Sequence, residues 1–153
     1  MVTVALYKPR IPPNTGNIMR LCSNMGFELN IVKPTGFSID DKALKRARMD
    51  YFSNTEPILY DNFKKFLNNK DSNHICVVTK YGDQLYNKVN YTNDSILLFG
   101  SETNGLPKEI LHSFSNKLIK IPMISGSRSL NLSNAVAIVA YEAWKQLKFS
   151  GAW

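Results

Sequence analysis

Three polar stretches of the chain have residue types that suit ligand-binding loops. The first, PPNTGNIMR (12–20), is a Pro/Asn/Gly loop that runs directly into an amphipathic pattern. Such a loop opens a helix, and the free N–H groups of a helix N-terminus bind anions. Arg20 lies one and a half turns into this helix, where its guanidinium could lean over the loop. A capped turn with a surface arginine is the more common interpretation of this segment when it is taken alone.

The second stretch, ILLFGSETNGLP (96–107), is an apolar run that ends at Gly100 and continues into a polar loop with a second glycine, Gly105. A glycine at a strand end lets a ligand approach the backbone, and open α/β sheets bind cofactors beyond the carboxyl ends of their strands. The spacing matches neither GxGxxG nor GxxxxGK[ST], so neither a dinucleotide site nor a nucleoside-triphosphate site is indicated. The composition alone predicts no more than a ligand cradle.

The third stretch, IPMISGSRSLNLSNAVAIVAYEAW (121–144), leads from an apolar run through Pro122 into a Gly/Ser loop and then a helix. Its backbone amides and hydroxyls suit an adenine ring and a ribose better than a triphosphate. A helix cap alone would not need so many polar side chains, and we therefore favour a binding function. These side chains are Ser127, Arg128, Ser129, Asn131, Ser133 and Asn134.

The elements that must position these loops follow an α/β pattern, in which short β-branched runs alternate with amphipathic segments around a mostly parallel sheet. The expected strands are 2–7, 29–33, 74–79, 95–99 and 117–121, with 57–60 as a candidate sixth. The expected helices are 15–25 (capped by Asn14 and ended by Gly26), 40–49, 61–69, a short one opened by Pro107, and 132–147. The last has a middle, 135–141, that is apolar on nearly every side, so it must be buried on several faces or shared with another chain.

The length and charge of the chain set further limits. Its 153 residues predict one domain, and its net charge of +7 makes nucleic acid the favoured large partner. The segment KALKRAR, with Arg46 and Arg48, is either a solvated basic face or an RNA-contacting face. No apolar stretch is long enough for a membrane span or a signal peptide, so we expect a soluble, cytoplasmic protein.

The cysteines and histidines predict neither a disulfide scaffold nor a metal site. Cys22 and Cys76 are far apart and belong to no CxxC motif, which makes them candidates for small buried hydrophobic residues. His74 and His112 are too few for a three-histidine site. We expect both histidines to be structural or surface residues.

Together, the three stretches closely resemble the SPOUT class of methyltransferases, which includes tRNA and ribosomal RNA ribose methylases. The motifs NTGNIMR (14–20), FGSETNGLP (99–107) and IPMISGSRSLNLSNA (121–135) occur in the order of that class and cover nearly the whole chain. The likeness is greatest to the small tRNA (cytidine/uridine-34)-2′-O-methyltransferases. It implies one SPOUT domain over 1–153, with a Rossmann-like sheet, helices on both faces and a C-terminal deep trefoil knot. General rules of chain connectivity would not predict the knot.

The same resemblance implies an activity. A small SPOUT homodimer would transfer the methyl group of S-adenosylmethionine to the ribose 2′-hydroxyl of the wobble nucleotide, cytidine or uridine 34, in tRNA. No metal is required, because the leaving group is a neutral thioether. A dimer would enlarge the basic surface and cover the apolar last helix.

The resemblance also implies roles for individual residues. It nominates Arg20 as the catalytic residue. The cofactor pocket, held mostly by backbone groups, would involve Val78, Thr79, Gly100, Ser101, Glu102, Ile121, Ser129, Leu130 and Asn134. The residues expected to bind RNA or support the site are Asn14, Arg46, Arg48, Arg128, Ser133 and Tyr141.

An arginine is physically awkward as a base, because its guanidinium stays protonated. We therefore expect Arg20 to act electrostatically, by fixing a phosphate beside the reacting ribose and stabilising charge on the attacking oxygen. It could act in its own subunit or across a dimer interface. The alternatives are a SPOUT enzyme acting on ribosomal RNA or another tRNA position, a knotted RNA-binding protein without catalysis, and a plain flavodoxin-like module.

Overall fold

The structure, a computed structural model, describes residues 1–38 and 56–153. The expected helix 40–49, with Arg46 and Arg48, lies outside the described residues. In the described ranges, seven strands form one sheet in the order β3, β2, β1, β6, β4, β7, β5, and every pairing is parallel. The strands are β1 (Thr3–Tyr7), β2 (Glu28–Val32), β3 (Ile58–Tyr60), β4 (Ile75–Val78), β5 (Gln84–Leu85), β6 (Ile96–Phe99) and β7 (Leu118–Lys120).

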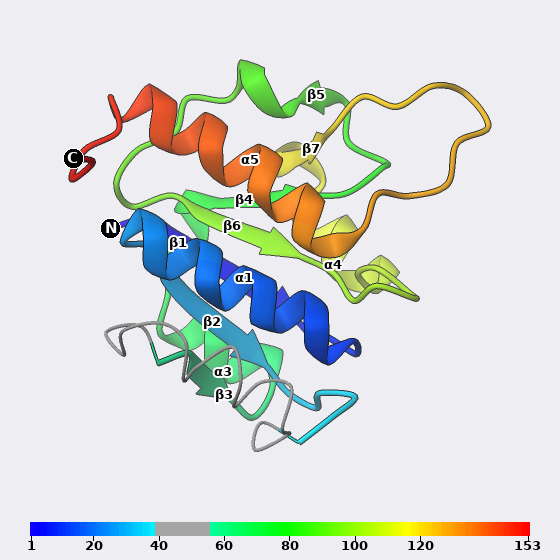
Figure 1. Ribbon diagram of the computed structural model, residues 1–153. Helices are drawn as coiled ribbons and strands as arrows, with labels where there is room; N and C mark the ends of the chain where they lie inside the picture. Colours follow the sequence, from blue (N-terminus) through cyan, green and yellow to red (C-terminus); the bar gives the residue numbers. More distant parts are fainter. Residues whose placement is uncertain (39–55) are drawn as a thin grey trace.

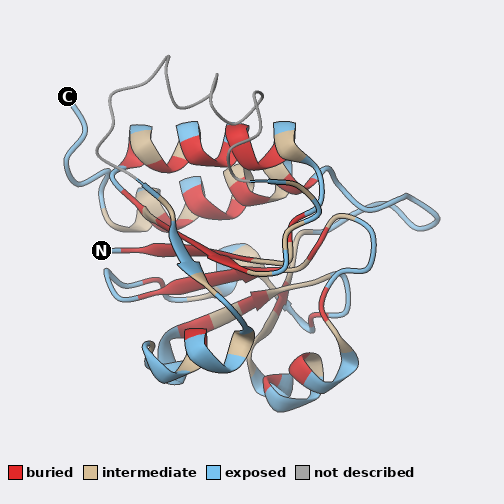
Figure 2. Cartoon of the chain, turned by 90° about the horizontal axis from the view of Figure 1, so that it is seen from below, coloured by how far each residue is buried: buried red, intermediate tan, exposed pale blue. Residues whose placement is uncertain are grey.

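Helices cover both faces of this sheet, as the sequence predicted (Figures 1 and 2). The longer pair, α1 (Pro12–Met25) and α5 (Leu132–Gln146), lies side by side on one face. The shorter pair, α3 (Phe63–Asn68) and α4 (Lys108–Ser113), lies on the other. Both faces are therefore shielded from water, which explains why the central strands read as continuous apolar runs.

The core is divided by the sheet into two layers. Successive residues of a strand point to opposite faces, so Leu6 packs with α1 and α5 whereas Ala5 packs toward α3 and α4. The central strand β6 is buried along its whole length because each of its faces meets a helix pair. Figure 2 shows this buried layer between the two exposed helical surfaces.

The first helix differs from its prediction at one end and matches it at the other. Gly26 ends α1 as predicted, in a left-handed conformation with φ of 64° that glycine adopts without strain. The N-terminal prediction is wrong, because α1 begins at Pro12 and Asn14 lies buried inside the first turn. Proline is favoured at the first helical position, and the N-cap residue, Ile11, provides no side-chain hydrogen bond. Pro107 likewise precedes α4 rather than forming part of it.

The last helix is apolar as predicted, but in this chain it is buried mainly on one side. Val136, Val139 and Ala140 are fully buried against α1 and the sheet. On the outer side, Tyr141 is 47% exposed and Ile138 is only half-buried. An outward apolar strip therefore remains on the α1/α5 face. Within the described residues no helix is long and apolar enough to cross a membrane.

The strand order brings the loops of interest to one edge. After β1 the chain adds β2 and β3 on one side of it, whereas β6, β4 and β7 lie on the other. Open parallel sheets bind ligands where the order in which strands are added reverses. The binding crevice there lies beyond the carboxyl ends of the strands. The loops that follow β1, β4, β6 and β7 therefore meet at one edge of the sheet.

Candidate functional site

A cavity of about 670 Å³ lies at this edge, beyond the carboxyl ends of β4 and β6. Its volume is within the range of small-molecule sites, roughly 300–1,000 Å³. Eight of the nine residues predicted to bind the cofactor line it, namely Val78, Thr79, Gly100, Ser101, Glu102, Ile121, Ser129 and Leu130. Asn134, the ninth, is exposed at the beginning of α5 and is not among the lining residues.

The loop after β6 is closed on itself by two glycines. The backbone N–H groups of Ser101 and Gly105 donate to each other's carbonyl oxygens at 3.1 and 2.9 Å. A Cβ atom on Gly100 would lie 2.3 Å from the carbonyl carbon of Gly105, so only glycine fits there. The close approach predicted at Gly100 is thus made by the chain's own backbone. The result is a tight loop that presents Ser101 and Glu102 to the cavity.

Glu102 holds this loop against the N-terminus of α1. Its carboxylate accepts hydrogen bonds from the backbone N–H groups of Arg10, at 2.8 Å, and Ile11, at 3.1 Å. It also accepts a bond of 3.2 Å from the Asn14 side-chain amide. The first turn of α1 has no acidic residue of its own, so Glu102 supplies the negative charge that a helix N-terminus favours.

Asn14 connects the first motif to the third. Its amide Nδ2 donates to Glu102, and its Oδ1 accepts a hydrogen bond of 2.9 Å from the Asn131 side chain. Asn131 in turn accepts from the backbone N–H and the hydroxyl of Ser133, at 2.9 and 2.7 Å. Asn14 is only 5% exposed, and these two hydrogen bonds give its buried amide nitrogen and oxygen partners inside the protein. One chain of hydrogen bonds thus joins all three motifs beside the cavity.

Several other residues line the cavity. Most lie within a few positions of a residue that was predicted to bind the cofactor, and Asn131 is one of the polar side chains for which the sequence favoured a binding function. These residues are Ile11, Lys80, Tyr81, Phe99, Thr103, Asn104, Gly105, Leu106, Leu111, Met123, Asn131, Leu132 and Ala135.

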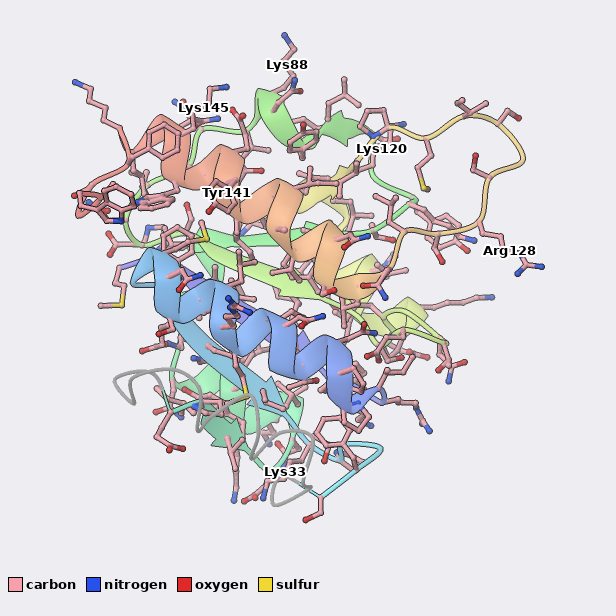
Figure 3. All side chains as sticks on the ribbon, viewed as in Figure 1. Lys33, Lys88, Lys120, Arg128, Tyr141 and Lys145 are labelled. Atoms are coloured by element: carbon pink, nitrogen blue, oxygen red, sulfur yellow. The ribbon has the colours of Figure 1, made fainter. Side chains whose placement is uncertain are left out.

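Other predicted site residues lie away from the cavity of their own chain. Arg20 is exposed on α1 and is not among the described residues that line the cavity. Arg128 is on the long exposed loop between β7 and α5, with its side chain directed away from the sheet (Figure 3). Tyr141 lies on the outer side of α5, where its ring packs edge-on against Trp144 at 5.7 Å. The structure therefore does not bring these side chains together with the cavity in one subunit.

The two cysteines are packing residues rather than reactive groups. Burial raises the pKa of the Cys22 thiol to about 12. Burial also raises the pKa of Cys76, although nearby Lys117 partly opposes the change. Both thiols stay protonated at neutral pH. In the ranges that the structure covers, no group of three or more His, Cys, Asp or Glu side chains could hold a metal ion.

Comparison with known proteins identifies relatives over the full chain. A "tRNA (cytidine(34)-2'-O)-methyltransferase" of Escherichia coli strain K12 is 46% identical over 153 residues, covering 99% of this chain and 98% of the relative. A solved structure that concerns the 2-OH methylation of C/U34 on tRNA has a TM-score of 0.89 and 37% identity, and the match covers 97% of each chain. An AdoMet-bound rRNA methyltransferase from Sinorhizobium meliloti has a TM-score of 0.84 and 27% identity, over 95% of this chain and 56% of that one.

The family assignment follows from the same comparison. The SpoU rRNA Methylase family matches residues 1–141, which include all of the first two motifs and the third through the middle of α5. The matching solved structures also have the α/β fold described above. The chain belongs to the SpoU rRNA Methylase family.

Proposed function

We propose that this protein transfers the methyl group of S-adenosylmethionine to the ribose 2′-hydroxyl of nucleotide 34, cytidine or uridine, in tRNA. The observation that carries the proposal is the cavity at which the three motifs converge through Glu102, Asn14 and Asn131. The substrate follows from relatives that are named for this reaction and match nearly the full chain. A tRNA substrate favours a cytoplasmic enzyme.

The cavity has the composition that such a cofactor requires. Apolar side chains, among them Val78, Ile121 and Leu130, can enclose an adenine ring. The backbone after β6 and the Glu102 carboxylate provide polar partners for a ribose and for a positively charged sulfonium group. Ser129 adds a hydroxyl from the third loop. We assign cofactor binding to the eight predicted residues that line the cavity and place Asn134 in a supporting role.

The chemistry requires orientation and charge stabilisation more than a strong base. Bound S-adenosylmethionine supplies an electrophilic methyl group whose departure leaves a neutral thioether. The ribose oxygen forms a bond to the methyl carbon as the carbon–sulfur bond breaks, and the hydroxyl proton passes to solvent or a substrate phosphate. Since a sugar hydroxyl is not ionised at neutral pH, a fixed cation beside the oxygen would lower the barrier.

We assign that cation to Arg20 and propose that it acts in the cavity of a partner subunit in a homodimer. Arg20 is exposed on α1, the helix that packs against α5, and Tyr141 is exposed on α5. A second copy on this face would cover the apolar strip of α5 and bring Arg20 to a cavity other than its own. Arg128, Ser133 and Tyr141 would then support RNA binding or the interface.

We also propose the deep trefoil knot of the SPOUT class for the C-terminal segment. The segment follows β7, which pairs with β4 inside the sheet, and it reaches α5 through a long exposed loop. Leu132 and Ala135, at the beginning of α5, line the cavity. A knot here would fix the third motif firmly against the first two.

A ribosomal RNA substrate is the second candidate. It is favoured by the family description and by the rRNA methyltransferase from Sinorhizobium meliloti. That relative is much longer, since the match covers only 56% of it, whereas the tRNA-modifying relatives match end to end. The shorter architecture therefore favours tRNA.

The test is to incubate the purified protein with total tRNA, total rRNA and labelled methyl donor, and to map the labelled nucleotide by mass spectrometry. We expect 2′-O-methylation at tRNA position 34, and label confined to rRNA would overturn the proposal.

Arg20→Ala should reduce the rate of methyl transfer by about a hundredfold or more, as for loss of a single oxyanion donor, while S-adenosylmethionine binding measured by calorimetry persists. Arg20→Lys keeps the positive charge but loses the planar guanidinium group with its paired N–H donors, so it should recover only part of the methyl-transfer rate.

A further inference from the structure

We propose that Tyr81, together with Lys80, forms a stacking site for an unpaired base of the RNA substrate at the mouth of the cavity. This inference rests on the proposed function and adds a substrate-positioning residue to it. Both residues line the cavity immediately after β4. Neither was predicted from the sequence.

Tyr81 lies at the outer edge of the cavity. Its side chain is 63% exposed, more than the other large apolar residues that line the cavity and are exposed, Ile11, Met123 and Leu130, at 42%, 36% and 40%. A tyrosine ring exposed to this extent is not part of the core. Because it lines the cavity and is largely exposed, it is accessible to a macromolecular substrate.

The turn that carries Tyr81 is held firmly. The Gly82 N–H donates to the Thr79 carbonyl at 3.3 Å, and the Tyr81 N–H donates to the Thr79 hydroxyl at 3.4 Å. A Cβ atom on Gly82 would lie 2.4 Å from the carbonyl carbon of Ile119, so this turn is pressed against the neighbouring strand. The backbone that carries the ring therefore needs little rearrangement when a base stacks on it.

Lys80 completes the features of a nucleotide site. Its Nζ lies 5.1 Å from the centroid of the Tyr81 ring, so a positive charge and an aromatic ring lie next to each other. Single-stranded RNA is bound by this combination, in which bases stack on aromatic rings and cations contact the backbone phosphates. The exposed apolar side chains of Ile11, Met123 and Leu130 around the same mouth favour a flat, partly apolar group such as a base.

The test measures RNA and cofactor binding separately, on the full-length protein. The probe is an anticodon stem-loop RNA with 2-aminopurine in its loop, whose fluorescence falls when the base stacks. Tyr81→Leu should weaken RNA binding about tenfold and abolish the quenching, whereas Tyr81→Phe, which keeps the ring, should behave as the wild type. S-adenosylmethionine affinity should change by less than about twofold in both variants. Lys80→Met should lower the slope of log Kd against log salt by about one.

The matched control is Trp153→Leu, which removes an exposed aromatic ring at the C-terminus, distant from the cavity (Figure 1). It should leave RNA binding unchanged. Wild-type RNA affinity in Tyr81→Leu would overturn the inference while leaving the proposed function intact. Loss of cofactor binding in Tyr81→Leu would assign the ring to the cofactor instead. A wild-type protein that neither binds nor methylates tRNA would overturn the proposed function and this inference together.

Discussion

Asn14 is the residue on which the arrangement of the three motifs depends most. It is buried, it donates to Glu102 and it accepts from Asn131, so one side chain bridges two loops that are far apart in sequence. Removing it leaves the Asn131 side-chain amide without its acceptor, and Glu102 Oε1 keeps only its hydrogen bond from the Ile11 N–H. A buried polar group left without its partner costs about 1–3 kcal/mol.

We therefore expect Asn14→Ala to lower the free energy of unfolding by about 1–3 kcal/mol, measured by urea denaturation. It should also weaken cofactor binding, because the second and third motifs lose their common anchor. Asn14→Asp should be worse, since it places a second carboxylate against Glu102. Asn17→Ala, an exposed asparagine on the same helix, is the control and should change neither quantity. Wild-type stability in Asn14→Ala would contradict this account of the bridge.

The candidate site could be predicted from sequence only in part, for reasons that these residues make clear. Motif resemblance located the cavity residues, because they follow one another in short segments. Glu102 was predicted to bind the cofactor, but its bonds to the backbone of Arg10 and Ile11 depend on a contact that spans 91 or 92 positions. No local pattern reveals such a contact. The exposure of Arg20 agrees with the surface-arginine interpretation, but helix periodicity does not tell whether a second chain meets that side.

Among the described residues, the predicted strands and helices were confirmed, and most errors fall at their boundaries. β6 and α5 were predicted within two residues at each end. The two-residue strand β5 was missed, since Gln84 and Leu85 are too few to form a pattern. The beginning of α1 was wrong because the residues just before it, Arg10 and Ile11, are held by Glu102, on another element. Local sequence therefore determines the elements, and tertiary contacts determine their ends.

An ion pair fastens β2 to the segment that follows α3, and it makes stability depend on pH. Lys70 Nζ lies 2.6 Å from Glu28 Oε1, and Asn30 and Thr3 also donate to this oxygen. Burial raises the pKa of Glu28, but hydrogen bonds from Lys70, Asn30 and Thr3 outweigh it, so the pKa lies below the ordinary value of 4.5. A carboxylate with a lowered folded pKa stabilises the fold above its unfolded pKa. That contribution is lost as the pH falls through the folded pKa.

Glu28→Gln should therefore lower the free energy of unfolding at about pH 7 by roughly 1 kcal/mol. The difference from wild type should shrink as the pH falls from about 4.5 through the lower folded pKa of Glu28, below which Glu28 is as neutral as the glutamine. Urea denaturation at several pH values measures this directly. The control is Asp61→Asn, which removes the exposed pairs with Lys33 and Lys65 and should change little. A difference between Glu28→Gln and wild type that is constant with pH would contradict the role of the Glu28 charge.

At the scale of the whole molecule, one subunit spreads its basic side chains widely. Figure 3 shows Lys88, Lys120 and Lys145 along one edge and Lys33 at the opposite one, with Arg128 on the extended loop. A domain of this length has a radius of gyration of about 15 Å, so a single copy offers a tRNA only a short contact. Pairing two copies would lengthen the basic surface and cover the outer strip of α5. In such a dimer, the cavity of one chain would belong to one active site and its Arg20 to the active site of the other chain.

Mixed dimers can test whether Arg20 acts across the interface. Arg20→Ala retains its cavity, whereas Ala135→Phe, which places a large ring in the cavity wall, retains Arg20. Each variant alone should be inactive. When they are co-expressed with different tags, half of randomly paired dimers are mixed, and each mixed dimer has one complete site. We therefore expect up to about a quarter of the wild-type rate.

The control is co-expression of Ala135→Phe with a second copy that carries both substitutions, which offers no intact cavity and should stay inactive. Thermal unfolding checks that both variants are folded, and sedimentation velocity checks that they remain dimeric. No recovery in dimers that are shown to be mixed would mean that Arg20 serves its own cavity, and α1 would then have to turn Arg20 inward when RNA binds. Recovery near a quarter would mean that neither subunit has a complete site by itself. In that case the dimer is the catalytic unit, and the outer face of α1 and α5 belongs to the active site.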